Sequence, residues 1–226
     1  MVVTGASSGI GLATARRLAE AGAALVLVAR GRERLEAVAG ELGAEAIAVD
    51  TADPAAVDAL RSRVLDGGTP FAVVNAAGGF DLAPVAETAP EMFDRMIDGN
   101  LRGPFLVTRA FLPAMLEAGA GVVVMVGSVA GRVAFPGNGA YSASKFGVRG
   151  LHAVLEQELR GTGVRCTLVE PAATDTPIWD PHAPDGRDDL PDRSAMLAPG
   201  AVADAIVYVL TRPPEVHLPA VSIQRS

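Results

Sequence analysis

The sequence predicts a single α/β domain, built on a doubly wound and mostly parallel β-sheet. Short runs of apolar, often β-branched residues alternate along the chain with longer segments rich in alanine, leucine and arginine. Nearly every position in these runs is apolar, which is typical of strands that helices cover on both faces. Alternation of strands and helices in turn implies right-handed crossovers between parallel strands.

Seven runs are expected to form the strands, and six segments are expected to form the helices between them. The predicted strands lie at residues 2–3, 24–29, 46–49, 71–74, 122–126, 165–169 and 216–223. The predicted helices lie at 11–21, 33–42, 54–65, 90–118 (expected to be two helices), 140–160 and 200–210. Only Met1 precedes the first run, so we expect a short first strand. No linker divides residues 1–226, and this favours one domain.

Composition excludes several classes of function. A net charge of -7 argues against nucleic acid as a partner, because a phosphate backbone requires a basic surface. No apolar run approaches the length of a membrane span, so no membrane partner is expected. The first residues do not resemble a secretory signal, and we expect a cytoplasmic protein. Cys166 is the only cysteine and the three histidines are far apart, so no metal site is expected.

The first predicted strand leads into the segment TGASSGIG, which precedes a predicted helix. Glycines there allow the backbone to approach a pyrophosphate closely, and the helix N-terminus supplies N–H donors and positive potential. The alternative is a purely structural turn, but a glycine-rich turn between strand and helix favours binding. The residues expected to bind a dinucleotide here are Gly5, Ser7, Ser8, Gly9, Ile10 and Gly11.

TGASSGIG resembles the cofactor loop of the short-chain dehydrogenase/reductase family. NAAG, from Asn75 through Ala76 and Ala77 to Gly78, is similar to that family's next motif, with Ala76 where a second asparagine is more usual. The resemblance extends over essentially the whole chain and implies a Rossmann fold with a seven-stranded sheet. It also implies that Asn75 steadies the central strands, and that Ala76, Ala77 and Gly78 let the backbone approach the cofactor.

Two positions bear on the adenosine half of the cofactor. Arg30 follows the second predicted strand, where an acidic residue would hydrogen-bond the ribose and repel a 2′-phosphate. A guanidinium suits a phosphate, so NADP(H) is favoured over NAD(H). The alternative is that Arg30, with Arg32 and Arg34, is a solvated helix start. The resemblance implies that Asp50, beside Thr51, contacts the adenine; by itself Asp50 could equally cap a helix, as could Asp53.

The segment YSASK places Tyr141 and Lys145 on one face of a predicted helix, because they are four residues apart. Lys145 is the only lysine in the chain. A free tyrosine has a pKa of about 10, and a neighbouring ammonium would lower it. Tyr141 could then act as general acid and base on a carbonyl or alcohol. The resemblance implies that Lys145 also binds the nicotinamide ribose. The alternative, a chance pair of core tyrosine and surface lysine, is disfavoured by the other motifs.

Ser128 ends the apolar run VVVMVGS and is expected to hydrogen-bond the substrate oxygen. Asn100, in DGNLRG, matches the family's asparagine that holds a water linking the lysine to solvent. Pro171, Thr174 and Thr176, in PAATDTP, resemble the segment that closes over the nicotinamide, with Ala172 where glycine is usual.

Residues 171–199 are rich in proline and aspartate and lack periodicity, and we expect them to form a substrate lid. Candidates for lining the substrate site are Trp179, His182, Arg187, Arg193 and Met196. Arg187 or Arg193 could pair with a substrate carboxylate, or could simply be solvated. The carboxyl-terminal segment resembles family members that act on 3-hydroxy acids, serine-type substrates or other small alcohols.

The sequence therefore predicts an oxidoreductase that transfers a hydride between NADP(H) and a small carbonyl or secondary alcohol. Two alternatives are a dinucleotide-binding sensor without turnover, and an epimerase or dehydratase for which the chain is short. Helices 101–118 and 140–160 carry more apolar positions than one core face requires. In the family these helices form a dimer contact, so we expect a homodimer or homotetramer.

Overall fold

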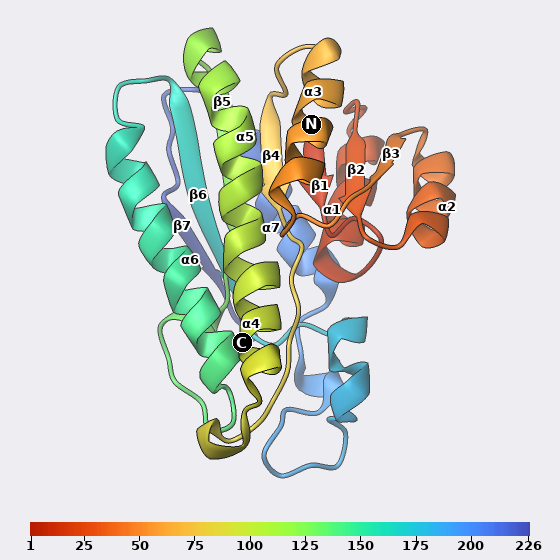
Figure 1. Cartoon of the computed structure of the whole chain (residues 1–226), viewed down its shortest axis with the longest axis vertical. Helices are drawn as coiled ribbons and strands as arrows, with labels where there is room; N and C mark the ends of the chain where they lie inside the picture. Colours follow the sequence, from red (N-terminus) through yellow and green to blue (C-terminus); the bar gives the residue numbers. More distant parts are fainter.

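The computed structural model describes residues 1–226 as a seven-stranded sheet with helices on both faces (Figure 1). All neighbouring strands are parallel and follow the order β3-β2-β1-β4-β5-β6-β7. The strands are β1 (Val2–Thr4), β2 (Val26–Ala29), β3 (Glu45–Ala48), β4 (Ala72–Asn75), β5 (Gly121–Val126), β6 (Val164–Pro171) and β7 (Ala220–Ile223). This is the doubly wound Rossmann arrangement that the sequence predicts, with every strand parallel rather than most of them.

Seven α-helices connect and cover the strands. They are α1 (Gly9–Glu20), α2 (Arg32–Leu42), α3 (Pro54–Asp66), α4 (Pro90–Ile97), α5 (Gly103–Ala118), α6 (Gly139–Glu158) and α7 (Pro199–Leu210). Local signals explain several of their ends. Asp53 caps α3 by accepting a hydrogen bond from the Ala55 N–H, and Pro54 begins that helix. Helices α2 and α5 end at Gly43 and Gly119, which adopt left-handed conformations.

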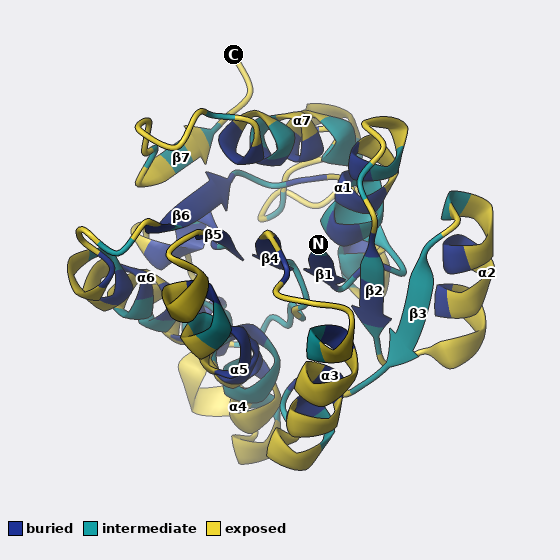
Figure 2. Ribbon diagram, turned by 90° about the horizontal axis from the view of Figure 1, so that it is seen from above, coloured by how far each residue is buried: buried dark blue, intermediate teal, exposed yellow.

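Two apolar layers hold the helices to the sheet (Figure 2). Successive side chains of a strand point to opposite faces, so Val2 belongs to one layer and Val3 to the other. One layer joins the strands to α3, α5 and α6, and the other joins them to α1, α2 and α7. Burial on both faces explains why these strands are apolar at nearly every position. None of the helices is both long and apolar enough to span a membrane.

The observed elements differ from the predicted ones mainly at their ends. Strand β2 begins at Val26, and β7 is confined to Ala220–Ile223 because it pairs only with Leu168–Pro171 at the edge of the sheet. The predicted pair of helices at 90–118 is present, but α4 and α5 are joined by a single π-helical turn, Asp98–Arg102. π-Turns of this kind occur frequently at functional sites.

Candidate active site

The strand order reverses beside β1, because the chain continues from β1 to β2 and β3 and then returns to β4 on the other side. The loops that follow β1 and β4 therefore diverge. Such a switch point opens a crevice at the carboxyl ends of the strands, where ligands bind in open α/β sheets.

The loop after β1 is shaped for close packing of backbone. Gly5 and Gly9 have φ angles of +67° and +54°, in the region that favours glycine. A Cβ atom on Gly5 would lie 2.7 Å from the Ala76 carbonyl oxygen, and one on Gly11 would lie 2.3 Å from the Gly5 carbonyl oxygen. These glycines are therefore required by the fold of the loop itself.

Thr4 ties this loop to the one after β4. Its buried hydroxyl accepts hydrogen bonds from the N–H groups of Ala76 and Ala77, both at 3.1 Å. Sequence reasoning missed Thr4 because its partners are more than 70 residues away. Asn75, at the end of β4, is buried and donates from Nδ2 to the Thr108 hydroxyl of α5, at 3.1 Å. Asn75 thus steadies the sheet against a helix.

The N-terminus of α1 suits an anion. Ser8 is its N-cap residue, yet no side chain accepts a hydrogen bond from the first turn, and that turn contains no acidic residue. A pyrophosphate would satisfy these N–H groups and complement the helix dipole. The site therefore fits the dinucleotide that the sequence predicts.

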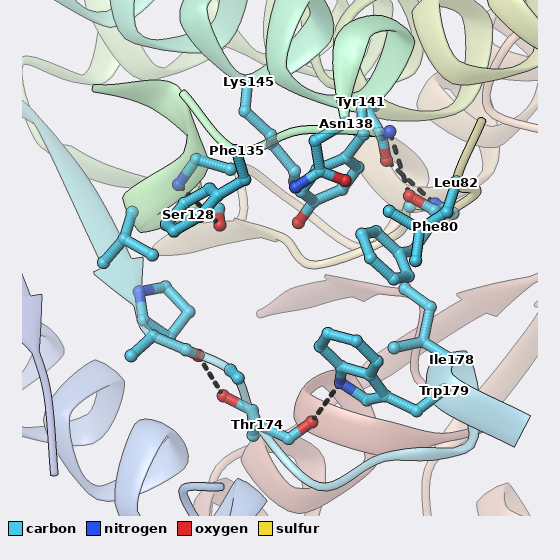
Figure 3. Close-up of a pocket in the computed structure, with 18 of the residues that line it drawn as sticks. Phe80, Leu82, Ser128, Phe135, Asn138, Tyr141, Lys145, Thr174, Ile178 and Trp179 are labelled. Atoms are coloured by element: carbon cyan, nitrogen blue, oxygen red, sulfur yellow. Dashed lines mark hydrogen bonds between the residues drawn. The ribbon is translucent and has the colours of Figure 1, made fainter. Parts of the chain in front are cut away.

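One cavity of about 780 Å³ collects most of the expected site residues (Figure 3). Those that line it are Ile10, Ala76, Ala77, Gly78, Asn100, Ser128, Tyr141, Lys145, Pro171, Thr174 and Thr176. Those that do not line it are Gly5, Ser7, Ser8, Gly9, Gly11, Arg30, Asp50, Thr51 and Asn75. The structure thus brings together the catalytic candidates from three separate segments of the chain.

Three of the residues outside the cavity belong to the predicted adenosine end. Arg30 is exposed beyond β2, and its guanidinium has no hydrogen-bond or ion-pair partner within the chain, whereas Arg32 pairs with Glu36. Asp50 is exposed and accepts from the Ala52 N–H at 3.0 Å, and the cap of α3 is Asp53. Thr51 is buried, and a Cβ atom on Gly103 would lie 2.7 Å from its hydroxyl.

Asn100 lies in the π-turn and is almost completely buried. Its Oδ1 accepts from the Gly79 N–H at 2.8 Å, and its Nδ2 donates to the Gly79 carbonyl at 3.0 Å and to the Ser144 hydroxyl at 3.1 Å. Ser144 in turn donates to the Tyr141 carbonyl at 2.6 Å. The side chain of Asn100 therefore joins the loop after β4 to the helix that carries Tyr141 and Lys145.

Ser128 follows β5 and is buried at the wall of the cavity. Its oxygen accepts a hydrogen bond from the Ala130 N–H at 3.1 Å, which leaves its own proton to donate. The hydroxyls of Ser128 and Tyr141 both project into the cavity in Figure 3. Two hydroxyls that face one space can hold a single carbonyl oxygen between them.

Lys145 is buried one helical turn after Tyr141, as the four-residue spacing predicts. Its Nζ donates to the Val126 carbonyl at 3.0 Å and lies 5.6 Å from the centre of the Tyr141 ring. Burial lowers the pKa of Lys145 to about 8, because an ammonium is poorly solvated there.

The expected lowering of the Tyr141 pKa by Lys145 is not what this structure shows. Burial raises the pKa of Tyr141, and the Ser128 hydroxyl opposes this only in part. The physical reason is that phenolate formation in a buried site costs solvation, while the Lys145 Nζ is directed to a backbone carbonyl. Ser128, rather than Lys145, is the neighbour that favours ionisation of Tyr141 here.

The segment after β6 folds across the cavity and contains two short 3-10 helices, Pro177–His182 and Arg193–Ala195. Of the expected lining residues, Trp179 and Arg187 line the cavity, whereas His182, Arg193 and Met196 do not. Arg193 is instead paired with Asp175 and Asp180, at 2.7 and 2.6 Å. Met196 is buried in the protein interior. Arg193 and Met196 therefore stabilise the fold of the segment after β6.

Phe80 is a site residue that sequence reasoning missed. Its ring meets the Tyr141 ring edge-on, with centroids 4.9 Å apart, and contacts Trp179 at 4.7 Å. The His182 ring contacts Phe80 from the lid, and its Nε2 lies 3.3 Å from the Phe80 carbonyl oxygen. An aromatic residue just after the NAAG motif was the only available signal, and nothing in the sequence indicated its partners.

Two hydroxyls and a buried amine line this crevice. The arrangement is typical of an oxidoreductase that depends on a nicotinamide dinucleotide. The model of the short chain dehydrogenase family matches residues 1–186, and the chain belongs to that family. An uncharacterised oxidoreductase of Staphylococcus epidermidis is 35% identical over 226 residues, which cover 99% of this chain and 95% of the relative.

Solved structures agree with this assignment. The closed form of a serine dehydrogenase complexed with NADP+ superposes with a TM-score of 0.90 at 29% identity, covering 98% of this chain and 93% of that one. An alcohol dehydrogenase from the archaeon Thermococcus sibiricus, complexed with 5-hydroxy-NADP, has a TM-score of 0.89 at 30% identity and coverage of 100% and 97%. Over nearly its whole length, the chain is therefore similar to dehydrogenases whose solved structures contain NADP forms.

Proposed function

We propose that this protein is an NADP(H)-dependent dehydrogenase or reductase that interconverts a small carbonyl compound and a secondary alcohol. The observation that carries the proposal is the placement of the Ser128 and Tyr141 hydroxyls on one cavity beside the buried Lys145. A sensor without turnover has no need of such a proton-transfer group.

Each residue has a defined part in the reaction. Ser128 donates a hydrogen bond to the carbonyl oxygen and positions it, since its own acceptor site is used by Ala130. Tyr141 gives its proton to that oxygen during reduction and removes the proton from the alcohol during oxidation. The bound dinucleotide supplies or accepts the hydride. One N–H of Lys145 bonds to Val126, and the others would hydrogen-bond the nicotinamide ribose. Asn100 holds α6 in place through Ser144.

The raised pKa of Tyr141 favours the protonated side chain, which is the form that reduction requires. A lysine with a pKa of about 8 can also exchange its proton near neutral pH. Lys145 would hold the nicotinamide ribose of a bound dinucleotide, and with its pKa of about 8 it would return a proton to Tyr141 near neutral pH. Asn100 would support this role by fixing the backbone around Lys145. Pro171, Thr174 and Thr176 line the same cavity and would cover a bound nicotinamide, and Thr174 lies across the cavity from Tyr141 in Figure 3.

Three further points support the preference for NADP(H). The Arg30 guanidinium is exposed and free of intramolecular partners. No acidic residue stands at the end of β2 to oppose a 2′-phosphate. Both similar solved structures named above are complexes with NADP forms. Asp50 and Thr51 complete this end of the site beside the adenine.

A hydride-transfer assay tests the proposal. NADPH binding is measured by fluorescence, and turnover is followed by reduced-nicotinamide absorbance with ketones, aldehydes, 3-hydroxy acids and secondary alcohols. Turnover of at least one carbonyl with NADPH is expected. Tight NADPH binding with no turnover across the whole panel would favour the sensor instead.

A further inference from the structure

The cavity has an aromatic wall beside Tyr141, and Asn138, which also lines the cavity there, is polar but uncharged. Phe80 lies directly against the Tyr141 ring, so the groups attached to a reacting carbonyl would meet a hydrocarbon surface. Trp179 extends this surface, and its only polar atom, Nε1, donates to the Thr174 carbonyl at 3.1 Å. Other large apolar side chains that line the cavity include Leu82, Phe135, Ile178 and Leu190.

The charged groups around this wall offer no free cation to a carboxylate. Besides Lys145, only Arg187 and Asp189 bring charge to the lining. Arg187 donates to both Asp189 oxygens, at 3.0 and 2.8 Å, and to the His182 carbonyl at 3.2 Å. A substrate carboxylate at Arg187 would therefore approach Asp189 as well. Arg193 is held away from the cavity by Asp175 and Asp180.

The lid adds negative charge to this mouth. Residues 183–192 contain four aspartates and one arginine, and all four aspartates are exposed. An anionic substrate would be repelled on approach, because exposed charges within about 10 Å of one another are only partly screened. The carbonyl site therefore combines an aromatic wall with an acidic lid segment, of which Asp189 lines the cavity paired with Arg187.

We infer that the substrate is an uncharged, ring-bearing or similarly bulky apolar ketone, or the matching secondary alcohol, and not a hydroxy acid or an amino acid. The inference rests on the proposed function, since it names the substrate class of that same site. Among the substrates suggested by the carboxyl-terminal segment, it favours other alcohols over 3-hydroxy acids and serine-type substrates. Phe80 and Trp179 select for the apolar group, and the Arg187–Asp189 pair disfavours acids.

Three ketones that differ in one group separate the possibilities. Acetophenone, benzoylformate and 2-aminoacetophenone share a ring but carry a methyl, a carboxylate and an aminomethyl group, and acetone lacks the ring. We expect kcat/KM with NADPH to be about 100-fold higher for acetophenone than for acetone or benzoylformate, as burial of a ring favours the transition state. A preference for benzoylformate or the amine with NADPH, or for L-serine or 3-hydroxybutyrate over 1-phenylethanol with NADP+, would overturn the inference and leave the proposed function intact.

Two variants assign the selectivity to residues. Phe80→Ala should lower the acetophenone-to-acetone ratio of kcat/KM about 10-fold, since it removes the wall against Tyr141. Phe71→Ala, at an exposed phenylalanine outside the cavity, is the matched control and should keep the ratio. Asp189→Asn should raise the benzoylformate-to-acetophenone ratio about 10-fold, because it releases Arg187. Unchanged ratios in both cavity variants would contradict the inference, and NADPH binding without turnover of any ketone would remove the proposed function with it.

Discussion

The Nζ atom of Lys145 lies 5.6 Å from the centre of the Tyr141 ring and donates its hydrogen bond to the Val126 carbonyl. The two side chains thus share one face of α6 without forming a direct pair of ammonium and phenolate oxygen. Burial raises the pKa of Tyr141 and lowers the pKa of Lys145 relative to their ordinary values. Each shift favours the neutral side chain. The site therefore stores protons on Tyr141 and gives up protons readily from Lys145.

The first prediction concerns the cost of burying Lys145. The folded-state pKa is about 8 and the ordinary value is 10.5, so between these pH values the unfolded chain binds more protons than the folded one. The penalty is complete below pH 8, at about 3 kcal/mol, and vanishes above about pH 10.5. Lys145→Met should therefore be more stable to unfolding than the wild type at pH 7. This difference in the free energy of unfolding should disappear between about pH 8 and 10.5.

Urea unfolding without added dinucleotide measures this difference over the pH range. Cys166, whose buried thiol has a pKa raised to about 12, titrates alike in both proteins, so its contribution cancels. A difference in the free energy of unfolding that does not vary with pH would show that Lys145 keeps an ordinary pKa.

The second prediction tests the acid/base role of Tyr141. Tyr141→Phe removes the proton donor but keeps the ring that Phe80 contacts, so kcat should fall by about 100-fold or more. NADPH affinity, measured by fluorescence titration, should be nearly unchanged. Tyr208→Phe is the matched control, because Tyr208 is exposed and does not line the cavity. Normal turnover by Tyr141→Phe would contradict the mechanism.

The third prediction concerns cofactor choice. Arg30→Ala should weaken NADPH binding by about 10- to 100-fold, the usual range for losing a charge-assisted hydrogen bond, and should change NADH binding little. Arg32→Ala is the control, because Arg32 pairs with Glu36. Equal losses for NADPH and NADH would show that Arg30 does not contact the 2′-phosphate.

The fourth prediction concerns Asn100 as a positioning residue. Asn100→Ala leaves the Gly79 N–H and carbonyl and the Ser144 hydroxyl without this partner, which should cost about 1–3 kcal/mol of stability. We expect kcat to fall more than NADPH affinity, since the helix that carries Tyr141 loses its tie. Gly99→Ala, whose added Cβ would contact nothing within 4 Å, controls for the adjacent helical turn. A variant that loses stability but keeps its kcat would limit Asn100 to a structural role.

The fifth prediction concerns assembly, for which we propose a homodimer or homotetramer. Phe105 and Leu116 on α5, and Phe146 and Val154 on α6, are 41% to 54% exposed in the single chain. A second copy of this chain would cover them and remove apolar area from water. Light scattering at micromolar concentration should give a dimer or tetramer mass, and Phe105→Glu with Phe146→Glu should reduce it. A monomeric wild type would contradict this proposal.

The motifs could be predicted because each of them is local. The glycine loop after β1 and the pair Tyr141 and Lys145 depend on backbone conformations or spacings within a few residues. The ends of β2 and β7 could not be predicted in the same way. Their lengths depend on how many residues the neighbouring strand offers for pairing, and apolar residues continue beyond those points.

The site residues that sequence reasoning missed have partners far away in the chain. Thr4 joins two loops that follow neighbouring strands but lie more than 70 residues apart in the chain. Ser144, on α6, accepts a hydrogen bond from Asn100 in the π-turn, 44 residues earlier. Phe80 acquires its role only when the lid brings Trp179 and His182 against it. Arg193 could not be separated from Arg187 by sequence, because its aspartate partners are set by the folding of the lid.

The sequence by itself determined the strand–helix alternation, the glycine loop and the spacing of Tyr141 and Lys145, since these follow from periodicity and from conformations within one helical turn. Only the tertiary structure decided the direction of the Tyr141 pKa shift and the pairing of Arg187 with Asp189 at the cavity. Both depend on burial and on which charges are already paired, and these properties arise only when distant segments pack together.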